Sequence, residues 1–175
     1  MTVLAEELAQ RFGCDLAPSS GSMEHGIVLV ADVPGEQEML GGKPFSGASG
    51  RYLESLLQSI GLSREAVYLT HVVKFRPPER EPNREEIAAF YPLLLEELHA
   101  LRPKIVVTLG RVSLNAFLPK LKISQVHAQP FTVNDGDLRF TLLPLFHPAA
   151  AFHNGKVRPM LQQGFTVLGE LLQAA

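Results

Sequence analysis

Residues 26–33 read GIVLVADV, a continuous apolar run that stops at Pro34-Gly35. A run that is apolar at every position, and not at alternate positions, is typical of a parallel strand buried on both faces. Two further runs have the same character, AVYLTHVVKF at 66–75 and KIVVTLG at 104–110. These three segments predict neighbouring core strands.

Segments with helical periodicity separate the predicted strands. The spacing of apolar residues predicts one helix over 52–61 and a longer one, capped by Asn83, that ends near Leu101. Residues 131–145 predict a hairpin whose second arm enters the sheet, and 159–172 a closing helix. This alternation predicts an α/β fold with a central, mostly parallel four-stranded sheet flanked by helices on both faces.

The composition favours one folded domain over residues 1–175, with 46% hydrophobic and 19% charged residues. A net charge of −2 gives no global basic signature, so any contact with nucleic acid must come from a local patch. No run reaches the length of a membrane span, and the N-terminal MTVLAEELAQRF is unlike a signal peptide. We therefore expect a cytoplasmic protein. Its single cysteine, Cys14, excludes an internal disulfide framework.

Polar side chains follow three of the predicted strands, in the turns ADVPGEQE (31–38), THVVKFRPP (70–78) and FHPAAAFHN (146–154). The carboxyl ends of parallel strands meet at one edge of the sheet, where open α/β sheets bind their ligands. The pattern alone therefore predicts a pocket at this edge.

Together these turns resemble the uracil-DNA glycosylase superfamily, and most of all its iron–sulfur branch (family 4). The matching blocks lie in the order of that branch, at 31–38, 42–50, 67–78, 92–94, 107–110 and 147–149. The resemblance implies the α/β fold of the superfamily and a prokaryotic, nucleoid-associated enzyme of base excision repair. Such a monofunctional glycosylase hydrolyses the N-glycosidic bond of uracil or another deaminated base in DNA.

The chain departs from the iron–sulfur branch at the positions of its cluster. Two of the four cysteines that this branch needs are replaced by Phe75 and Phe90, and Cys14 marks at most one of the other two. Two phenyl rings can fill by packing a volume that the cluster fills by ligation. We therefore expect no iron–sulfur cluster and no other cofactor. The spacing of the histidines and acids also fits no metal-binding pattern.

The resemblance implies two catalytic residues, Glu38 and His147. A carboxylate at Glu38 can orient or deprotonate the attacking water, and His147 can donate a hydrogen bond to the base oxygen that becomes negative. The alternatives are a solvated loop acid for Glu38 and a histidine satisfied by a backbone carbonyl for His147.

Five residues are expected to contact the base: Asp32, Val33, Gly35, Phe45 and His71. Phe45 can stack on the base, or be an ordinary core aromatic. Gly35 leaves open a wall that a Tyr closes in strict uracil enzymes, or only serves a tight turn. Val33 occupies the position of a water-activating Asp in other branches, and Asp32 replaces a Glu and can instead bond the backbone.

His71 stands where the iron–sulfur branch has an Asn that reads the base edge. A neutral imidazole has its donor and acceptor on opposite sides of a rigid ring, which does not suit a bidentate match to uracil. We therefore expect weaker discrimination for uracil and a broader range of deaminated bases. The alternative is that His71 turns away and packs beneath Arg76.

The expected partner is DNA with a flipped deaminated base, bound by a monomer. Ala151 or Phe152 follows the HPA block, where the superfamily inserts a side chain into the duplex. Cations that flank the turns are candidate phosphate contacts, or solvated surface: Lys74, Arg76, Arg80, Lys156 and Arg158. Two other functions remain open, an inactive homologue that binds nucleic acid or nucleotides, and a hydrolase of free nucleosides.

Overall fold

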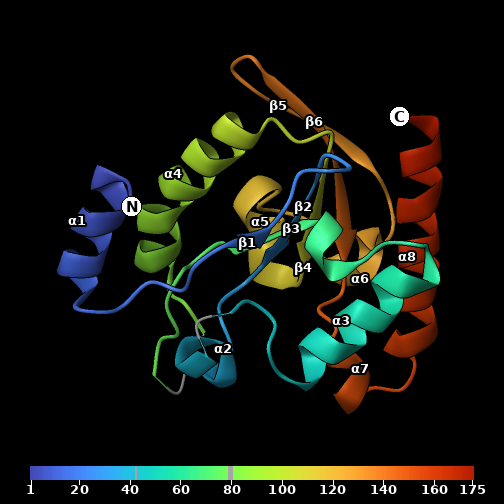
Figure 1. Cartoon of the computed structure of the whole chain (residues 1–175), viewed down its shortest axis with the longest axis horizontal. Helices are drawn as coiled ribbons and strands as arrows, with labels where there is room; N and C mark the ends of the chain where they lie inside the picture. The colour runs from blue at the N-terminus through green and yellow to red at the C-terminus, as the bar shows by residue number, and fades with distance from the viewer. Residues whose placement is uncertain (42, 79–80) are drawn as a thin grey trace.

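The computed structural model describes residues 1–41, 43–78 and 81–175. Within these residues one sheet has six strands, in the order β1-β3-β2-β4-β6-β5 (Figure 1). The strands are β1 (Ser20–Gly21), β2 (Ile27–Ala31), β3 (Tyr68–His71), β4 (Ile105–Leu109), β5 (Phe131–Asp135) and β6 (Leu138–Leu145). The predicted α/β class and parallel core are confirmed, because β3, β2, β4 and β6 pair in parallel.

The strand number differs from the predicted four because an antiparallel strand lies at each edge. β1 pairs with β3 over only two residues, too few to leave a pattern in the sequence. β5 is the first arm of the predicted hairpin and pairs antiparallel with β6. Both additions lie away from the centre of the sheet.

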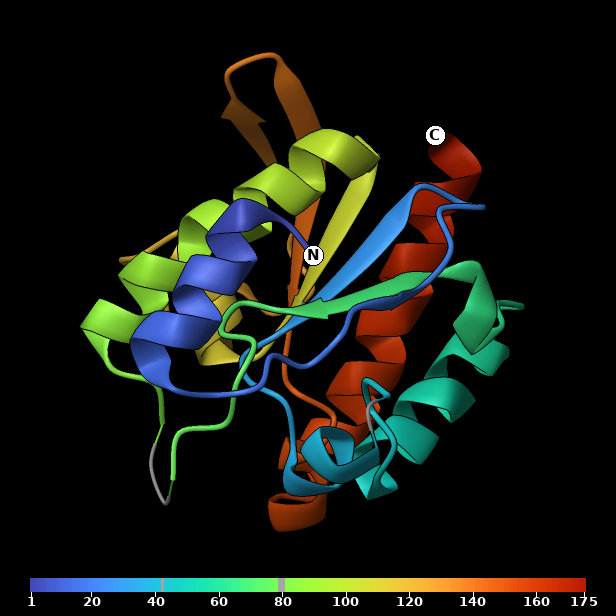
Figure 2. The same ribbon diagram turned by 60° about the vertical axis from the view of Figure 1, so that its left-hand side comes forward.

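Helices cover both faces of the sheet. They are α1 (Val3–Phe12), α2 (Glu36–Gly41), α3 (Ala48–Ser59), α4 (Arg84–Leu101), α5 (Arg111–Phe117), α6 (Ile123–Val126), α7 (Ala150–His153) and α8 (Val157–Ala174). In Figures 1 and 2, α1 and α4 lie on one side of the sheet and α3 and α8 on the other. None of the helices in the described part of the chain combines the length and apolar character needed to cross a membrane.

Side chains of β2 alternate between two core layers. Ile27 and Leu29 pack in the layer beneath α3 and α8, while Val28 and Val30 pack in the layer beneath α1 and α4. All four are completely buried. The continuous apolar run therefore encodes burial on both faces, as the sequence predicts.

The helix at α4 has the start and end that its sequence predicts. Asn83 accepts the backbone N–H of Glu86, whose side chain in turn accepts the N–H of Asn83, so the two form a capping box. The helix ends at Leu101 because Arg102 adopts a left-handed conformation, with φ of 48°.

β3 is shorter than the predicted strand at 66–75 and directs neighbouring side chains to opposite faces. Thr70 faces α4, where its hydroxyl donates to Glu97, and His71 faces the other layer, beside Phe45. After His71 the chain leaves the sheet, although Val72 N–H still donates to the carbonyl of Ala31 at 2.9 Å. This alternation decides which polar residues of the turn reach the candidate site.

Candidate active site

Glu38 lies on α2, directly after the turn that follows β2. Its Oε2 accepts the backbone N–H of Gly35 at 3.1 Å and the ring Nε2 of His71 at 3.0 Å. Only 9% of the residue is exposed. The alternative of a solvated loop acid is therefore wrong, because the side chain folds back onto the turn.

The surroundings of Glu38 favour its ionised form. Burial raises the pKa of Glu38, but hydrogen bonding and the charge of His71, together with backbone groups of Gly35 and Phe45, lower it below its ordinary value. Glu38 is consequently a carboxylate at neutral pH, and a weak base.

The backbone of Phe45 is held in an unusual conformation. It adopts φ of 56°, which is uncommon for a residue with a side chain, and is 1% exposed. Its carbonyl accepts Arg64 Nη1 at 2.7 Å. Behind that carbonyl stands Gly50, where a Cβ would lie only 1.5 Å from the oxygen. The backbone of Phe45 is therefore closely held, and its buried ring lies beside the two histidines.

The rings of Phe45, His71 and His147 are nearly parallel. The centroid of Phe45 lies 5.8 Å from that of His71, with 12° between the planes, and 6.0 Å from that of His147, with 17° between the planes. The nitrogens of an imidazole donate and accept within the ring plane. A flat ligand stacked on Phe45 would therefore lie parallel to the imidazole rings, with its edge toward hydrogen-bonding groups.

His147 has a defined tautomer. Its Nδ1 accepts the backbone N–H of Ala149 at 3.0 Å, so the proton of the neutral ring is on Nε2. Desolvation lowers the pKa of His147 to about 4, with the charge of Glu38 opposing that shift and the charge of His71 adding to it. The contact is thus not with a backbone carbonyl, and the ring is a neutral donor at physiological pH.

Three of the residues expected to contact the base also make contacts within the fold. Asp32 makes the backbone bond that is its alternative role: its Oδ1 accepts the N–H of Ser113 at 2.7 Å at the start of α5, and burial raises its pKa. Val33 is partly buried and packs on the layer beneath α1 and α4, and its contact with the base stays a prediction. Gly35 contributes its N–H to Glu38 and has no left-handed backbone that would require glycine.

His71 does not adopt the alternative orientation beneath Arg76, and its contact with the base stays a prediction. It is 1% exposed and turns toward Phe45 and Glu38, not beneath Arg76. The pattern of the sequence does not signal this contact, because 33 residues separate its two partners.

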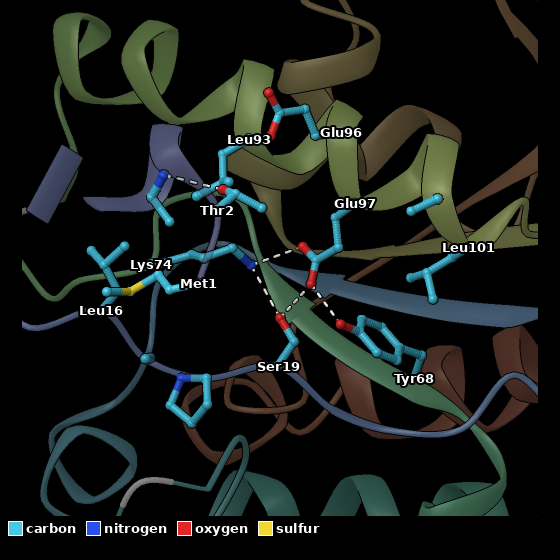
Figure 3. A pocket seen from close by; sticks show the side chains of 14 residues that line it. Met1, Thr2, Leu16, Ser19, Tyr68, Lys74, Leu93, Glu96, Glu97 and Leu101 are labelled. Atoms are coloured by element: carbon cyan, nitrogen blue, oxygen red, sulfur yellow. Dashed lines mark hydrogen bonds and ion pairs between the residues drawn. The ribbon is translucent and has the colours of Figure 1, made fainter. Parts of the chain in front are cut away.

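Lys74 corrects the expectation of a phosphate contact. It is 7% exposed, and its Nζ donates to Glu97 Oε2 at 2.9 Å and to Ser19 Oγ at 3.1 Å. Figure 3 shows Lys74, Glu97, Ser19 and Tyr68 converging on one wall of a pocket of about 560 Å³. This pocket lies between the N-terminal segment and α4, the side to which Thr70 points and from which His71 turns away.

The remaining expected DNA contacts differ in exposure. Phe152 on α7 is 49% exposed, whereas Ala151 is buried. Sequence reasoning misses Tyr52, whose ring lies 6.1 Å from that of Phe152 and 4.6 Å from the guanidinium carbon of Arg158. Arg76 and Lys156 are exposed. Arg80, and Gly42 of the second sequence block, lie outside the described residues.

Three phenylalanines pack together, and two of them, Phe75 and Phe90, are those that the resemblance places at cysteine positions of the iron–sulfur branch. Phe12, Phe75 and Phe90 have centroids 5.6 Å apart in each pair. Phenyl rings cannot ligate iron, and burial followed by the charge of Asp15 raises the pKa of the Cys14 thiol. Among the described residues, no group of three or more His, Cys, Asp or Glu is placed to hold a metal ion. The side chains present do not fit an iron–sulfur cluster.

Comparisons with known proteins agree with the motifs. The Uracil DNA glycosylase superfamily matches residues 18–166. A Type-4 uracil-DNA glycosylase of Saccharolobus solfataricus is 36% identical over 171 residues, covering 94% of this chain and 79% of that protein. One from Archaeoglobus fulgidus is 37% identical, with 90% and 86% covered. A Type-5 uracil-DNA glycosylase of Thermus thermophilus is 34% identical over 129 residues, with 65% and 58% covered. The chain belongs to the uracil-DNA glycosylase superfamily.

Proposed function

We propose that this protein is a monofunctional DNA glycosylase of DNA repair that hydrolyses the N-glycosidic bond of uracil or another deaminated base. The observation that carries the proposal is the parallel arrangement of Phe45, His71 and His147 beside an ionised, buried Glu38. A flipped base can stack on Phe45, with its edge facing the Nε2–H of His147.

His147 supplies the donor for the leaving base. As the glycosidic bond breaks, negative charge collects on the base oxygen, and the Nε2–H of the neutral ring can donate to it. A neutral imidazole keeps its proton throughout, because the anion of a deaminated base is a far weaker base than an imidazole anion. His147 thus stabilises the anion without transferring a proton.

Glu38 orients water and stabilises the sugar. Since its pKa is lowered, Glu38 is a poor acceptor for a whole proton early in the reaction. A fixed carboxylate can instead align a water by accepting its hydrogen bond, and can offset the positive charge that develops on the sugar. Between the two roles that the sequence leaves open, the electrostatics favour orientation over deprotonation.

The chain is proposed to act without an iron–sulfur cluster. Phe12, Phe75 and Phe90 fill the corresponding region with apolar surface, and Phe90 is completely buried. Their mutual packing joins α1, the turn after β3 and α4. Hydrophobic packing therefore does for this chain what ligation does for the branch that it resembles.

Phe152 is the proposed wedge that fills the space left by the flipped nucleotide. Replacing Phe152 with Ala is expected to raise KM for a uracil-containing duplex about tenfold, because stacking on one base contributes roughly 1–3 kcal/mol. The effect should be much smaller on the same sequence as a single strand, where no duplex must be opened. Steady-state kinetics on both substrates check this, with Phe152→Leu as a variant that retains an apolar wedge. Equal losses on both substrates would remove Phe152 from the role of wedge.

The function itself is tested with oligonucleotides that carry one uracil, hypoxanthine, xanthine or hydroxymethyluracil. The expected result is a strand that breaks only after alkali treatment, since a monofunctional enzyme leaves an intact abasic site. The Glu38→Gln protein, purified in parallel, controls for a contaminating glycosylase. Binding without excision of any base would favour an inactive homologue, and cleavage of free nucleosides a nucleoside hydrolase.

A further inference from the structure

The contact between His71 and Glu38 joins the end of β3 to α2. Nε2 of His71 lies 3.0 Å from Oε2 of Glu38, and the histidine is 1% exposed. An ionised carboxylate can only accept hydrogen bonds, so the proton of this contact is on the imidazole. An Asn at the same position has a shorter side chain and carries its amide nearer to the strand.

We propose that His71 is a positioning residue for Glu38: its Nε2–H fixes the orientation of the carboxylate and is not available to read the base. The inference rests on the proposed function for what Glu38 does, but the contact itself stands independently. It assigns base discrimination to groups other than this nitrogen.

The carboxylate of Glu38 is held in place because two donors bind the same oxygen. Gly35 N–H and His71 Nε2 both bind Oε2, one from the turn after β2 and the other from the end of β3. Two bonds to the same oxygen, from elements that are paired in the sheet, restrict rotation of the carboxylate. A carboxylate held in this way can accept a hydrogen bond from the attacking water in a fixed direction.

The titratable groups around His71 determine which ionisation a pH experiment would detect. Among the described residues, the titratable groups that face it are Glu38 from α2 and His147 from the turn after β6. Phe45 covers its ring. Asp32, at the end of the neighbouring strand, directs its carboxylate to Ser113 instead. Glu38 is therefore the acid whose ionisation His71 controls.

Removal of the His71 imidazole should raise the pKa of Glu38, because burial then acts without the opposing effect of His71. In the intact protein, His71 is the largest influence that lowers the pKa of Glu38, and burial raises it. Without His71, the ionised form of Glu38 is lost at a higher pH. We expect His71→Ala to move the acid limb of the single-turnover rate to higher pH.

The experiment measures single-turnover excision from about pH 5 to 9 on uracil and hypoxanthine substrates. His71→Ala is expected to lower the rate at neutral pH roughly 10- to 100-fold, because a misplaced water-orienting group is costly. His71→Gln keeps a donor of similar reach and should restore part of the rate and of the acid limb. The ranking of the two bases should stay as in the parent protein for all His71 variants, His71→Asn included.

His99→Asn is the matched control. His99 makes a comparable contact, with Nε2 at 2.7 Å from Asp135 Oδ2, on the hairpin side of α4. Loss of that contact should leave both the pH profile and the base ranking unchanged. A changed base ranking in His71→Asn with an unmoved acid limb would overturn the proposal and assign base reading to His71.

A measurement without substrate separates this inference from the proposed function. The ¹⁵N chemical shifts of the His71 ring are expected to differ between the parent protein and Glu38→Gln, because the acceptor of Nε2–H loses its charge. Identical shifts would overturn the contact. If the shifts differ but the parent protein excises no base, the proposed function fails while the pairing stands.

Discussion

Replacing His147 with Ala is expected to lower the single-turnover rate of base excision about 10²- to 10³-fold, the range for loss of one donor to a developing anion. The Nδ1 of His147 is occupied by the N–H of Ala149, so the ring directs its only proton from Nε2. An interaction made chiefly in the transition state changes the rate far more than binding. Affinity for the substrate duplex, measured by fluorescence anisotropy, should change by no more than about twofold.

The pKa of His147 sets the pH range of this effect. Since desolvation lowers that pKa to about 4, the ring is neutral throughout the neutral and alkaline range. Its contribution to the rate should therefore be constant there, and the ratio of parent to His147→Ala rates should not vary from about pH 6 to 9. A ratio that grows on acidification would show that a protonated ring acts.

Two comparison proteins make the result interpretable. His25→Ala removes an exposed histidine from the loop before β2 and should retain full activity. Glu38→Gln should lower the rate by a similar factor for a different reason, the loss of a fixed negative charge beside the sugar. Unchanged excision by His147→Ala, with the protein folded, would exclude His147 from the mechanism.

Replacing Phe90 with Ala is expected to lower the free energy of unfolding by about 3–5 kcal/mol. Phe90 is completely buried on α4, and its ring contacts those of Phe12 and Phe75. Removal of the ring leaves a cavity between α1 and α4 that neighbouring side chains fill only in part. Urea denaturation monitored by circular dichroism measures the change. For a chain of 175 residues it corresponds to a fall in Tm of roughly 10 °C.

The matched control is Phe152→Ala, which removes the same ring from a site that is 49% exposed and should change stability by less than about 1 kcal/mol. Iron analysis of the parent protein completes the experiment, with a colourless protein expected. Stoichiometric iron with visible absorption would contradict the proposal that phenyl packing replaces the cluster. So would a Phe90→Ala protein as stable as its parent.

The central strands and the main helices could be predicted because their signals are local. A buried parallel strand is apolar at nearly every position, so the strands at Ile27–Ala31 and Ile105–Leu109 can be predicted from their local sequence alone. The cap at Asn83 is encoded within four consecutive residues. α2 has no such signal, because six residues with a glycine at the end are too few for a helical period. The edge strand β1, two residues long, has none either.

The candidate site also has one part that the local sequence predicts and one part that it does not. Motif resemblance is sufficient to select Glu38, Phe45, His71 and His147, which the fold brings together. Which of these side chains contact one another cannot be predicted from motifs, because it depends on the register between strands and on the face to which each side chain points. The alternation of β3 sends Thr70 toward α4 and His71 toward Phe45.

Contacts between segments distant in the chain decide which charged side chains are already paired. Lys74 meets Glu97 across 23 residues, and Asp32 meets the start of α5 across 81. Each residue type is compatible with DNA or base contact in its local sequence, and only the packing of the layers shows that its charge is already engaged. Burial explains why such pairing is obligatory, since an unpaired charge in an apolar layer costs several kcal/mol. Local sequence therefore specifies the elements and the kinds of residue at the sheet edge, and the stacking of the layers specifies which of them meet.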